Sequence, residues 1–153
     1  IRIARYIKIV LNTYTSSLQE NIKVRLMVGF LTEEYFRQVQ KVANADEEFQ
    51  IKARGFTGGF TFKVTDKDLP PIYVMFQDGK VTEVRKIKEG EETDYALEGP
   101  YETWVSVNKG ELDAANAIMT REIRFLGSIS SIMRYSKAFL RLFTVMTEVP
   151  VEY

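Results

Sequence analysis

Residues 58–87 read GGFTFKVTDKDLPPIYVMFQDGKVTEVRKI, and this stretch contains the clearest signals of secondary structure in the chain. Residues 60–65 alternate between apolar and polar side chains, which is typical of a strand buried on one face. Residues 72–76 and 81–87 flank the pair Asp78-Gly79, which favours a tight type I′ turn between two antiparallel strands. The stretch therefore predicts a half-buried strand followed by a β-hairpin.

Two further strands are predicted on the C-terminal side of this hairpin. Residues 93–97 follow the turn-forming run KEGEE and end at Gly99-Pro100. Residues 121–126 alternate, and Ile123 and Phe125 are expected to point inward. The first four strands follow one another in a succession that is typical of antiparallel pairing.

Five helices are predicted around these strands. Thr32, Asp46 and Asp113 are suited to cap the first, second and fourth helix, because their side-chain oxygens can accept hydrogen bonds from free backbone N–H groups. The fifth helix carries one broad apolar face and stops before Pro150. The five segments are residues 33–44, 47–54, 101–107, 114–119 and 128–147.

The first 31 residues form a separate part of the sequence. Residues 3–14 carry apolar side chains at helical spacing, which predicts an amphipathic helix. Residues 22–30, IKVRLMVGF, fit both a strand and a helix, and the sequence leaves these two alternatives open. The predicted organisation is an amphipathic helical extension over residues 1–31 and a domain over residues 32–153.

The composition excludes several classes of site. The chain contains no histidine and no cysteine, so zinc centres, iron–sulfur clusters and Ser-His-Asp or Cys-His catalysis are not expected. The 21 basic residues balance the 21 acidic residues, so no net charge attracts the protein to nucleic acid or to an anionic membrane, although local basic faces remain possible. We therefore predict no catalytic residues, no metal, no cofactor and no nucleic-acid partner.

The sequence also predicts where the protein works. It has no run of about 20 apolar residues that would cross a membrane, and no leader of the secretory type. A soluble protein is expected, and the lack of cysteine fits a reducing cytoplasm.

Several local strings, in their order, resemble the sterol carrier protein type-two family, especially its free-standing microbial members. The resemblance covers residues 32–146. It departs from the family at Thr120-Arg121, where a Gly-Lys pair is often found before the last strand. The strings that carry it are TEEYFRQV, GFTGGFTFKVTD, FQDGKV, GEETDYALEGPYETWVSVNKGELDAANAIM and REIRFLGS.

The resemblance implies an α+β fold with a five-stranded, largely antiparallel sheet covered by helices. It also implies an apolar tunnel between sheet and helices that accepts sterols, fatty acids or fatty acyl-CoA esters. The alternative for each lining residue is an ordinary place in the core. The candidate lipid-binding residues are Phe60, Phe62, Val64, Tyr73, Met75, Trp104, Ile123, Phe125, Ile129, Met133, Phe139, Phe143 and Met146.

Three basic residues, Arg134, Lys137 and Arg141, follow one another at helical spacing in the last predicted helix. A charged helix face is usually a solvated surface. The functional alternative is contact with anionic lipid headgroups or with the phosphates of an acyl-CoA, which includes transient contact with a membrane surface.

Three hypotheses about function remain. The first is a carrier that binds or transfers lipid without catalysis. The second is an accessory or dimerisation module of a lipid-metabolising complex. In this hypothesis the N-terminal amphipathic helix is the partner surface, for example in a homodimer, because such a helix needs a surface for its apolar face. The third is an enzyme limited to carboxylate, lysine or tyrosine chemistry.

Overall fold

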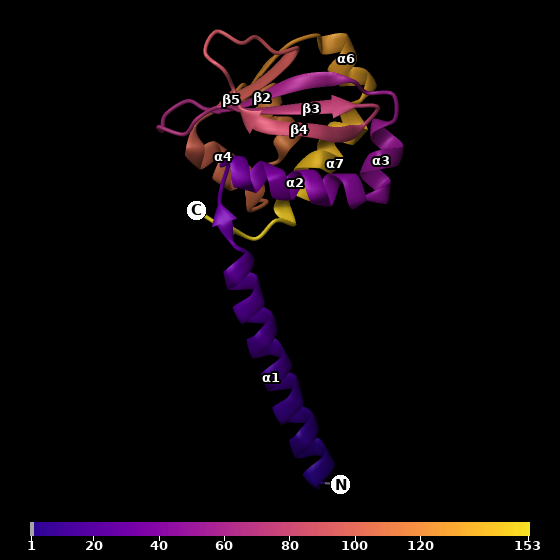
Figure 1. Cartoon of the computed structure of the whole chain (residues 1–153), viewed down its shortest axis with the longest axis vertical. Helices are drawn as coiled ribbons and strands as arrows, with labels where there is room; N and C mark the ends of the chain where they lie inside the picture. The colour runs from indigo at the N-terminus through magenta and orange to yellow at the C-terminus, as the bar shows by residue number, and fades with distance from the viewer. Residues whose placement is uncertain (1) are drawn as a thin grey trace.

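The three strands predicted from residues 58–87 are present in the computed structural model, which describes residues 2–153 (Figure 1). They are β2 (Gly58–Val64), β3 (Ile72–Gln77) and β4 (Lys80–Lys86), and each pairs with the next in antiparallel fashion. Asp78 and Gly79 have φ values of 49° and 79°. Positive φ at both central residues is the condition of a type I′ turn, so the predicted hairpin is confirmed.

The sheet is completed by β5 (Tyr95–Gly99) and β6 (Arg124–Leu126), and its order is β4-β3-β2-β5-β6. It is mostly antiparallel, as predicted, but β5 runs parallel to β2. The expected antiparallel succession of the first four strands is therefore wrong. Residues 87–94 cross back along the sheet and return the chain to the end from which β4 started, and a connection of this kind produces a parallel pair.

The last strand begins three residues later than predicted. Arg121 has a φ of 62°, which belongs to a turn and not to a strand, and regular pairing starts at Arg124. Ile123 is fully buried just before the strand, and Phe125 is half-buried within it.

Four of the predicted helices are present, and three of them have the predicted side-chain caps. The four helices are α2 (Glu33–Ala45), α3 (Glu47–Ala53), α4 (Tyr101–Asn108) and α5 (Ala114–Met119). The side chains of Thr32, Asp46 and Asp113 accept hydrogen bonds from the backbone N–H groups three residues later, at 3.2, 2.6 and 3.1 Å. These three helices, α2, α3 and α5, therefore start where their capping residues predicted.

The fifth predicted helix is not continuous. It is divided into α6 (Ile129–Arg134) and α7 (Ser136–Thr147), because Tyr135 leaves the helical conformation with φ −108° and ψ 20°. Serines 130, 131 and 136 surround this break and have weaker helix propensity than the residues that follow. No residue of α6, all of which are described, is buried, so little packing energy holds it in line with α7.

Helices α2, α3 and α7 lie against one face of the sheet (Figure 1). Phe60 is at the centre of this interface, and its ring lies 4.9 Å from that of Tyr95 and 5.3 Å from that of Phe139, between ring centroids. The hydroxyl of the buried Tyr35 donates a hydrogen bond of 3.1 Å to the carbonyl of Met146, and burial raises the pKa of this hydroxyl. Large buried side chains, with their few polar atoms paired, thus join α2 and α7 to the sheet.

The free edge of the sheet at β4 is covered by α2. The side chain of Asn44 accepts a hydrogen bond of 2.8 Å from the backbone N–H of Val81 and donates one of 2.9 Å to its carbonyl. Gln40 donates a further one of 3.0 Å to the same carbonyl. These amides substitute for part of a neighbouring strand and protect the edge from pairing with another chain.

An ion pair links α7 to α3. The guanidinium of Arg141 donates two hydrogen bonds to the carboxylate of Asp46, at 3.1 and 2.6 Å, and lies 3.2 Å from Glu48. The bond from Arg141 and the backbone N–H of Phe49 hold the pKa of the Asp46 carboxyl below its usual value. One carboxylate therefore caps α3 and fixes its position against α7.

Residues 22–30, whose sequence fits both a helix and a strand, contain one of each. Helix α1 (Arg2–Leu26) runs through its first half, and a two-residue strand β1 (Val28–Gly29) follows and pairs in parallel with β7 (Val151–Glu152). Phe30 and Leu31 are then buried in the core.

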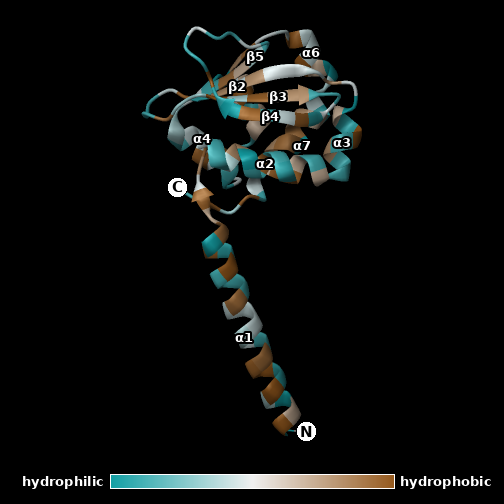
Figure 2. Ribbon diagram, viewed as in Figure 1, coloured by the Kyte–Doolittle hydropathy of each residue, from teal (hydrophilic) through white to brown (hydrophobic). Residues whose placement is uncertain are grey.

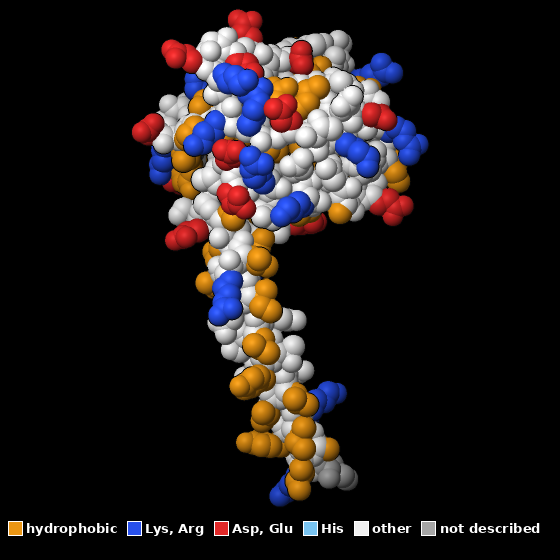
Figure 3. All heavy atoms as spheres, viewed as in Figure 1, with side chains coloured by type: hydrophobic (Ala, Val, Ile, Leu, Met, Phe, Trp, Pro, Cys, Tyr) orange, Lys and Arg blue, Asp and Glu red, His pale blue; other side chains and the backbone are white. Residues whose placement is uncertain are grey.

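Helix α1 extends away from the rest of the molecule (Figure 1). Apolar residues, brown in Figure 2, and polar residues, teal, are both found along it, and Figure 3 shows its apolar side chains exposed. Within residues 2–153, no helix is both long and apolar enough to cross a membrane.

The turn at Gly79 provides a test of the fold. A Cβ on Gly79 would lie 2.6 Å from the carbonyl oxygen of Ala53, whereas a Cβ on Gly90, which also has a positive φ, would meet nothing within 4 Å. Gly90→Ala should lower the free energy of unfolding by about 1 kcal/mol, the conformational cost alone. Gly79→Ala should cost about 2 kcal/mol more, because the hairpin must also move away from α3. Urea unfolding of the two variants measures this difference, and equal losses would contradict the close approach.

The ion pair predicts a dependence of stability on pH. Because the pKa of Asp46 is lower in the folded than in the unfolded protein, its contribution is complete above the unfolded value of about 3.9. This contribution is lost as the pH falls through the folded pKa. Asp46→Asn keeps a capping side chain but removes the charge. We expect this variant to be less stable than the wild type at pH 7, by a margin that shrinks below about pH 4 and disappears in stronger acid.

Thermal unfolding between neutral and acidic pH measures this margin. Asp113→Asn is the matched control, since Asp113 also caps a helix but has no ion-pair partner in the described residues 2–153. A margin for Asp46→Asn that stayed constant with pH would show that the charge does not stabilise the fold.

Candidate functional site

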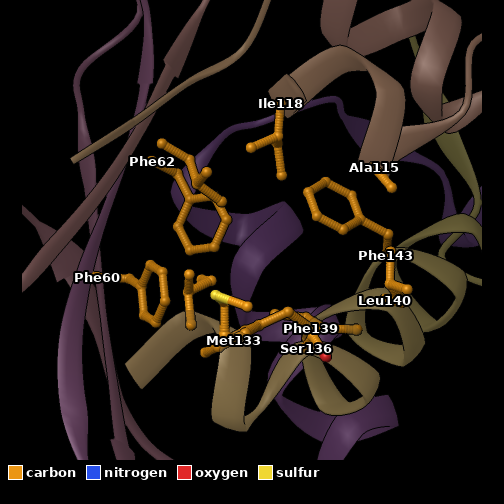
Figure 4. A pocket seen from close by; sticks show the side chains of 12 residues that line it. Phe60, Phe62, Ala115, Ile118, Met133, Ser136, Phe139, Leu140 and Phe143 are labelled. Atoms are coloured by element: carbon orange, nitrogen blue, oxygen red, sulfur yellow. The ribbon is translucent and has the colours of Figure 1, made fainter. Parts of the chain in front are cut away.

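A pocket with a volume of about 200 Å³ lies between the sheet and helices α5, α6 and α7 (Figure 4). Figure 4 shows Phe60 and Phe62 on one side, Ile118 and Ala115 above, Phe143 on the other side, and Met133 and Phe139 below. The lining residues are Phe60, Phe62, Leu97, Ala115, Ile118, Ile132, Met133, Ser136, Phe139, Leu140, Leu142 and Phe143.

The periodicity of each element explains which side chains reach the pocket. Successive side chains of a strand alternate between its faces, so Phe60 and Phe62 both point toward the helices while Thr61 points away. On α7, positions 136, 139, 140 and 143 follow the spacing of three and four residues that places side chains on one helix face. Ala115 and Ile118 of α5 have the same spacing.

The most exposed lining residues of the pocket belong to α6 and α7. Met133 and Leu140 line it and are nevertheless 70% and 45% exposed to solvent. Ser136 lies between them at the start of α7 and is the only polar residue among those that line the pocket. The interior therefore offers no charged or amide group to a ligand. We call the exposed side of the pocket, formed by Met133, Ser136 and Leu140, its mouth.

Five of the predicted lipid-binding residues line this pocket: Phe60, Phe62, Met133, Phe139 and Phe143. Another four, Val64, Trp104, Ile123 and Met146, are buried in the core. The ring of Trp104 lies 6.2 Å from that of Phe62 and 6.4 Å from that of Phe143, so it supports the pocket wall from behind.

The remaining four predicted residues lie outside the pocket. Tyr73 and Met75 are on the opposite face of the sheet, since Tyr73 is the register partner of Thr61 and its ring is covered by the guanidinium of Arg85 at 4.1 Å. They therefore do not line this pocket. The run IYVMF is apolar at every position, so its sequence does not indicate which side chains face the helices. Phe125 stacks on Tyr95, and Ile129 is 67% exposed on α6.

Sequence reasoning missed seven lining residues. Ser136 and Leu140 could have been found, because they share the helical spacing of Phe139 and Phe143. The two residues of α5 gave no such signal, since nothing local shows that this short helix covers the sheet. The missed residues are Leu97, Ala115, Ile118, Ile132, Ser136, Leu140 and Leu142.

The predicted cationic stripe is divided by the structure. Arg141 is engaged by Asp46 and Glu48, so it is not available as part of a free stripe. Arg134 and Lys137 are exposed, and each directly follows a residue that lines the pocket, Met133 and Ser136. In the described part of the chain, no group of three or more acidic side chains is placed to hold a metal ion.

Comparison with known proteins identifies the family. Residues 36–140 match the model of the SCP-2 sterol transfer family. A crystal structure of sterol carrier protein 2 superposes with a TM-score of 0.70 and 21% identity, over 78% of this chain and 98% of that chain. The solution structure of a conserved hypothetical protein from Thermus thermophilus, described as a candidate sterol carrier protein, superposes with a TM-score of 0.70 and 20% identity. This match covers 80% of this chain and 91% of that chain.

No curated protein matches the sequence significantly. The two solved structures show the same α+β fold, with its mostly antiparallel five-stranded sheet. The family model covers more than half of the sequence, including every strand of this sheet. The chain therefore belongs to the SCP-2 sterol transfer family.

Proposed function

We propose that this protein is a non-catalytic carrier that binds the apolar chain of a lipid in the pocket between the sheet and α5–α7. The observation that supports this most strongly is the lining, in which eleven of twelve side chains are apolar. The family name, sterol transfer, agrees with transport of a lipid and not with its chemical conversion.

Burial alone supplies the binding energy in this proposal. Each methylene group that leaves water contributes about 0.8 kcal/mol, and an apolar pocket needs no hydrogen bond to hold it. An engineered apolar cavity of about 150 Å³ stays dry and binds benzene. The pocket of about 200 Å³ is therefore large enough for a short stretch of chain as it stands.

A long chain requires a larger space than this. Helix α6 is the wall that moves most easily in our proposal, because none of its residues is buried. Its displacement would widen the mouth and leave the sheet, α5 and α7 in place. The family's tunnel would then form when the ligand enters.

The polar end of the ligand has no partner inside and stays at the mouth. Exposed Arg134 and Lys137 lie beside this opening, and a cation there attracts a carboxylate or phosphate more than an uncharged hydroxyl. We therefore propose a fatty acid or a fatty acyl-CoA as the preferred ligand over a sterol.

A substitution that fills the pocket tests the proposal. Ala115→Phe places a ring into space that the lipid chain would occupy. Binding of a fluorescent fatty acid to delipidated protein should weaken at least about tenfold, since about two buried methylene groups correspond to that factor. A fluorescence titration measures the affinity, and native mass spectrometry shows whether one ligand is bound.

Asn116→Phe is the matched control, because it adds the same ring to an exposed position next along α5. This variant should bind as the wild type does. If the wild type takes up no fatty acid, the carrier function is wrong. If both variants bind equally well, the ligand lies elsewhere.

A further inference from the structure

Helix α1 presents a long apolar surface to solvent. None of its 25 described residues, Arg2–Leu26, is buried, and at about 1.5 Å per residue it is about 37 Å long. Figure 3 shows its apolar side chains exposed along the whole length. The large apolar residues on it are Ile3, Tyr6, Ile7, Ile9, Val10, Leu11, Tyr14, Leu18, Ile22, Val24 and Leu26.

These residues are distributed unevenly around the helix. At about 100° per residue, Ile3, Ile7 and Leu18 fall on one side, together with Val10, Leu11 and Tyr14. The opposite side is polar and contains Arg5, Lys8, Asn12, Gln19 and Lys23. Four residues depart from this division. Ile9 and Leu26 lie among the polar residues, and Asn21 and Arg25 fall on the apolar side, in line with Ile3 and Ile7.

The charge of α1 indicates the chemistry of its partner. The helix carries five basic residues and a single acidic one, Glu20, although the whole chain is neutral. Arg5, Lys8 and Lys23 lie on the polar side, so they stay accessible when the apolar side is covered. A helix with an apolar face and a basic polar face is suited to the surface of a bilayer that contains anionic lipids.

A second copy of the same helix fits less well. A coiled-coil seam that starts at Ile3 continues through Ile7, Val10 and Tyr14 but then reaches Ser17 and Asn21. Two apolar heptads are fewer than the three or four that a coiled coil sustains. Two paired copies of α1 would also bring ten basic and two acidic residues together, and the like charges would repel each other.

We infer that α1 lies on the surface of an anionic bilayer, with its apolar side between the headgroups and its basic side toward the lipid phosphates and carboxylates. The connection to the domain is short, and backbone hydrogen bonds from Val28 to Pro150 and from Phe30 to Glu152, of 3.2 and 3.0 Å, fix it. The domain is therefore held next to the bilayer. This inference goes beyond the carrier function, because it concerns a helix that contributes nothing to the pocket.

Flotation of the full chain with vesicles tests this inference. We expect binding to vesicles of phosphatidylcholine with about 30 mol% phosphatidylserine, and much weaker binding to phosphatidylcholine alone. Ile7→Ser should weaken binding to the anionic vesicles about tenfold, the equivalent of one buried aliphatic side chain. Ile9→Ser, a matched control two residues away on the polar side, should bind as the wild type does.

The basic residues are tested separately. Replacing Arg5, Lys8 and Lys23 together by glutamine should weaken binding to anionic vesicles on the order of a hundredfold and leave binding to neutral vesicles unchanged. Raising the salt concentration from about 0.1 to about 1 M should have a similar effect on the wild type, because salt screens exposed charges.

Three results would overturn the inference. The first is no preference of the wild type for anionic vesicles, and the second is equal losses for Ile7→Ser and Ile9→Ser. The third is a dimer in light scattering that Ile7→Ser converts to a monomer without any vesicle binding, which would make a second copy the partner. Fatty-acid titration without vesicles should be unchanged in all α1 variants, so failure here is distinct from failure of the carrier function.

Discussion

Phe60 packs against aromatic rings from four other segments of the chain, and the two layers of the domain depend on this cluster. The partners outside its own strand come from the segment before β2, from β3, from β5 and from α7. Aromatic rings are rigid, so their packing fixes the distance between the sheet and α7 near the start of β2. The rings around Phe60 are Phe56, Phe62, Phe76, Tyr95 and Phe139.

The pocket lies beside this rigid cluster and shares part of it. Phe60 and Phe139 contact each other and also line the cavity, so one wall is fixed by the packing that holds the fold together. The opposite wall differs, since α6 has no buried residue and Met133 is largely exposed. A rigid wall opposite a weakly held one fits the carrier function proposed above, in which the ligand is a flexible chain.

Local chemistry in the sequence predicted much of the fold. Asp78-Gly79 determines a turn type, and Thr32, Asp46 and Asp113 each determine a helix start, because these effects act within a few residues. The parallel pairing of β5 depends instead on the path of residues 87–94 across the sheet. The break at Tyr135 has a local contribution from the serines around it, but it also depends on the weak packing of α6, which the sequence does not reveal.

The candidate site was predictable to a smaller extent for the same reason. Clear alternation in β2 assigned Phe60 and Phe62 to the correct face. In β3, where every position from Ile72 to Phe76 is apolar, only the register with β2 shows that Tyr73 and Met75 face outward. Lining residues on α5 depend on which helix covers which part of the sheet, and that is a property of the assembled domain.

The pairing of β1 with β7 places the first and last strands of the domain next to each other. Phe30 and Tyr153 continue this contact, with their ring centroids 5.1 Å apart. The chain therefore enters and leaves the domain on the same side of the molecule, close to β1 (Figure 1). Such a unit can be inserted into a longer polypeptide as a cassette, because the flanking chain would enter and leave without crossing the pocket.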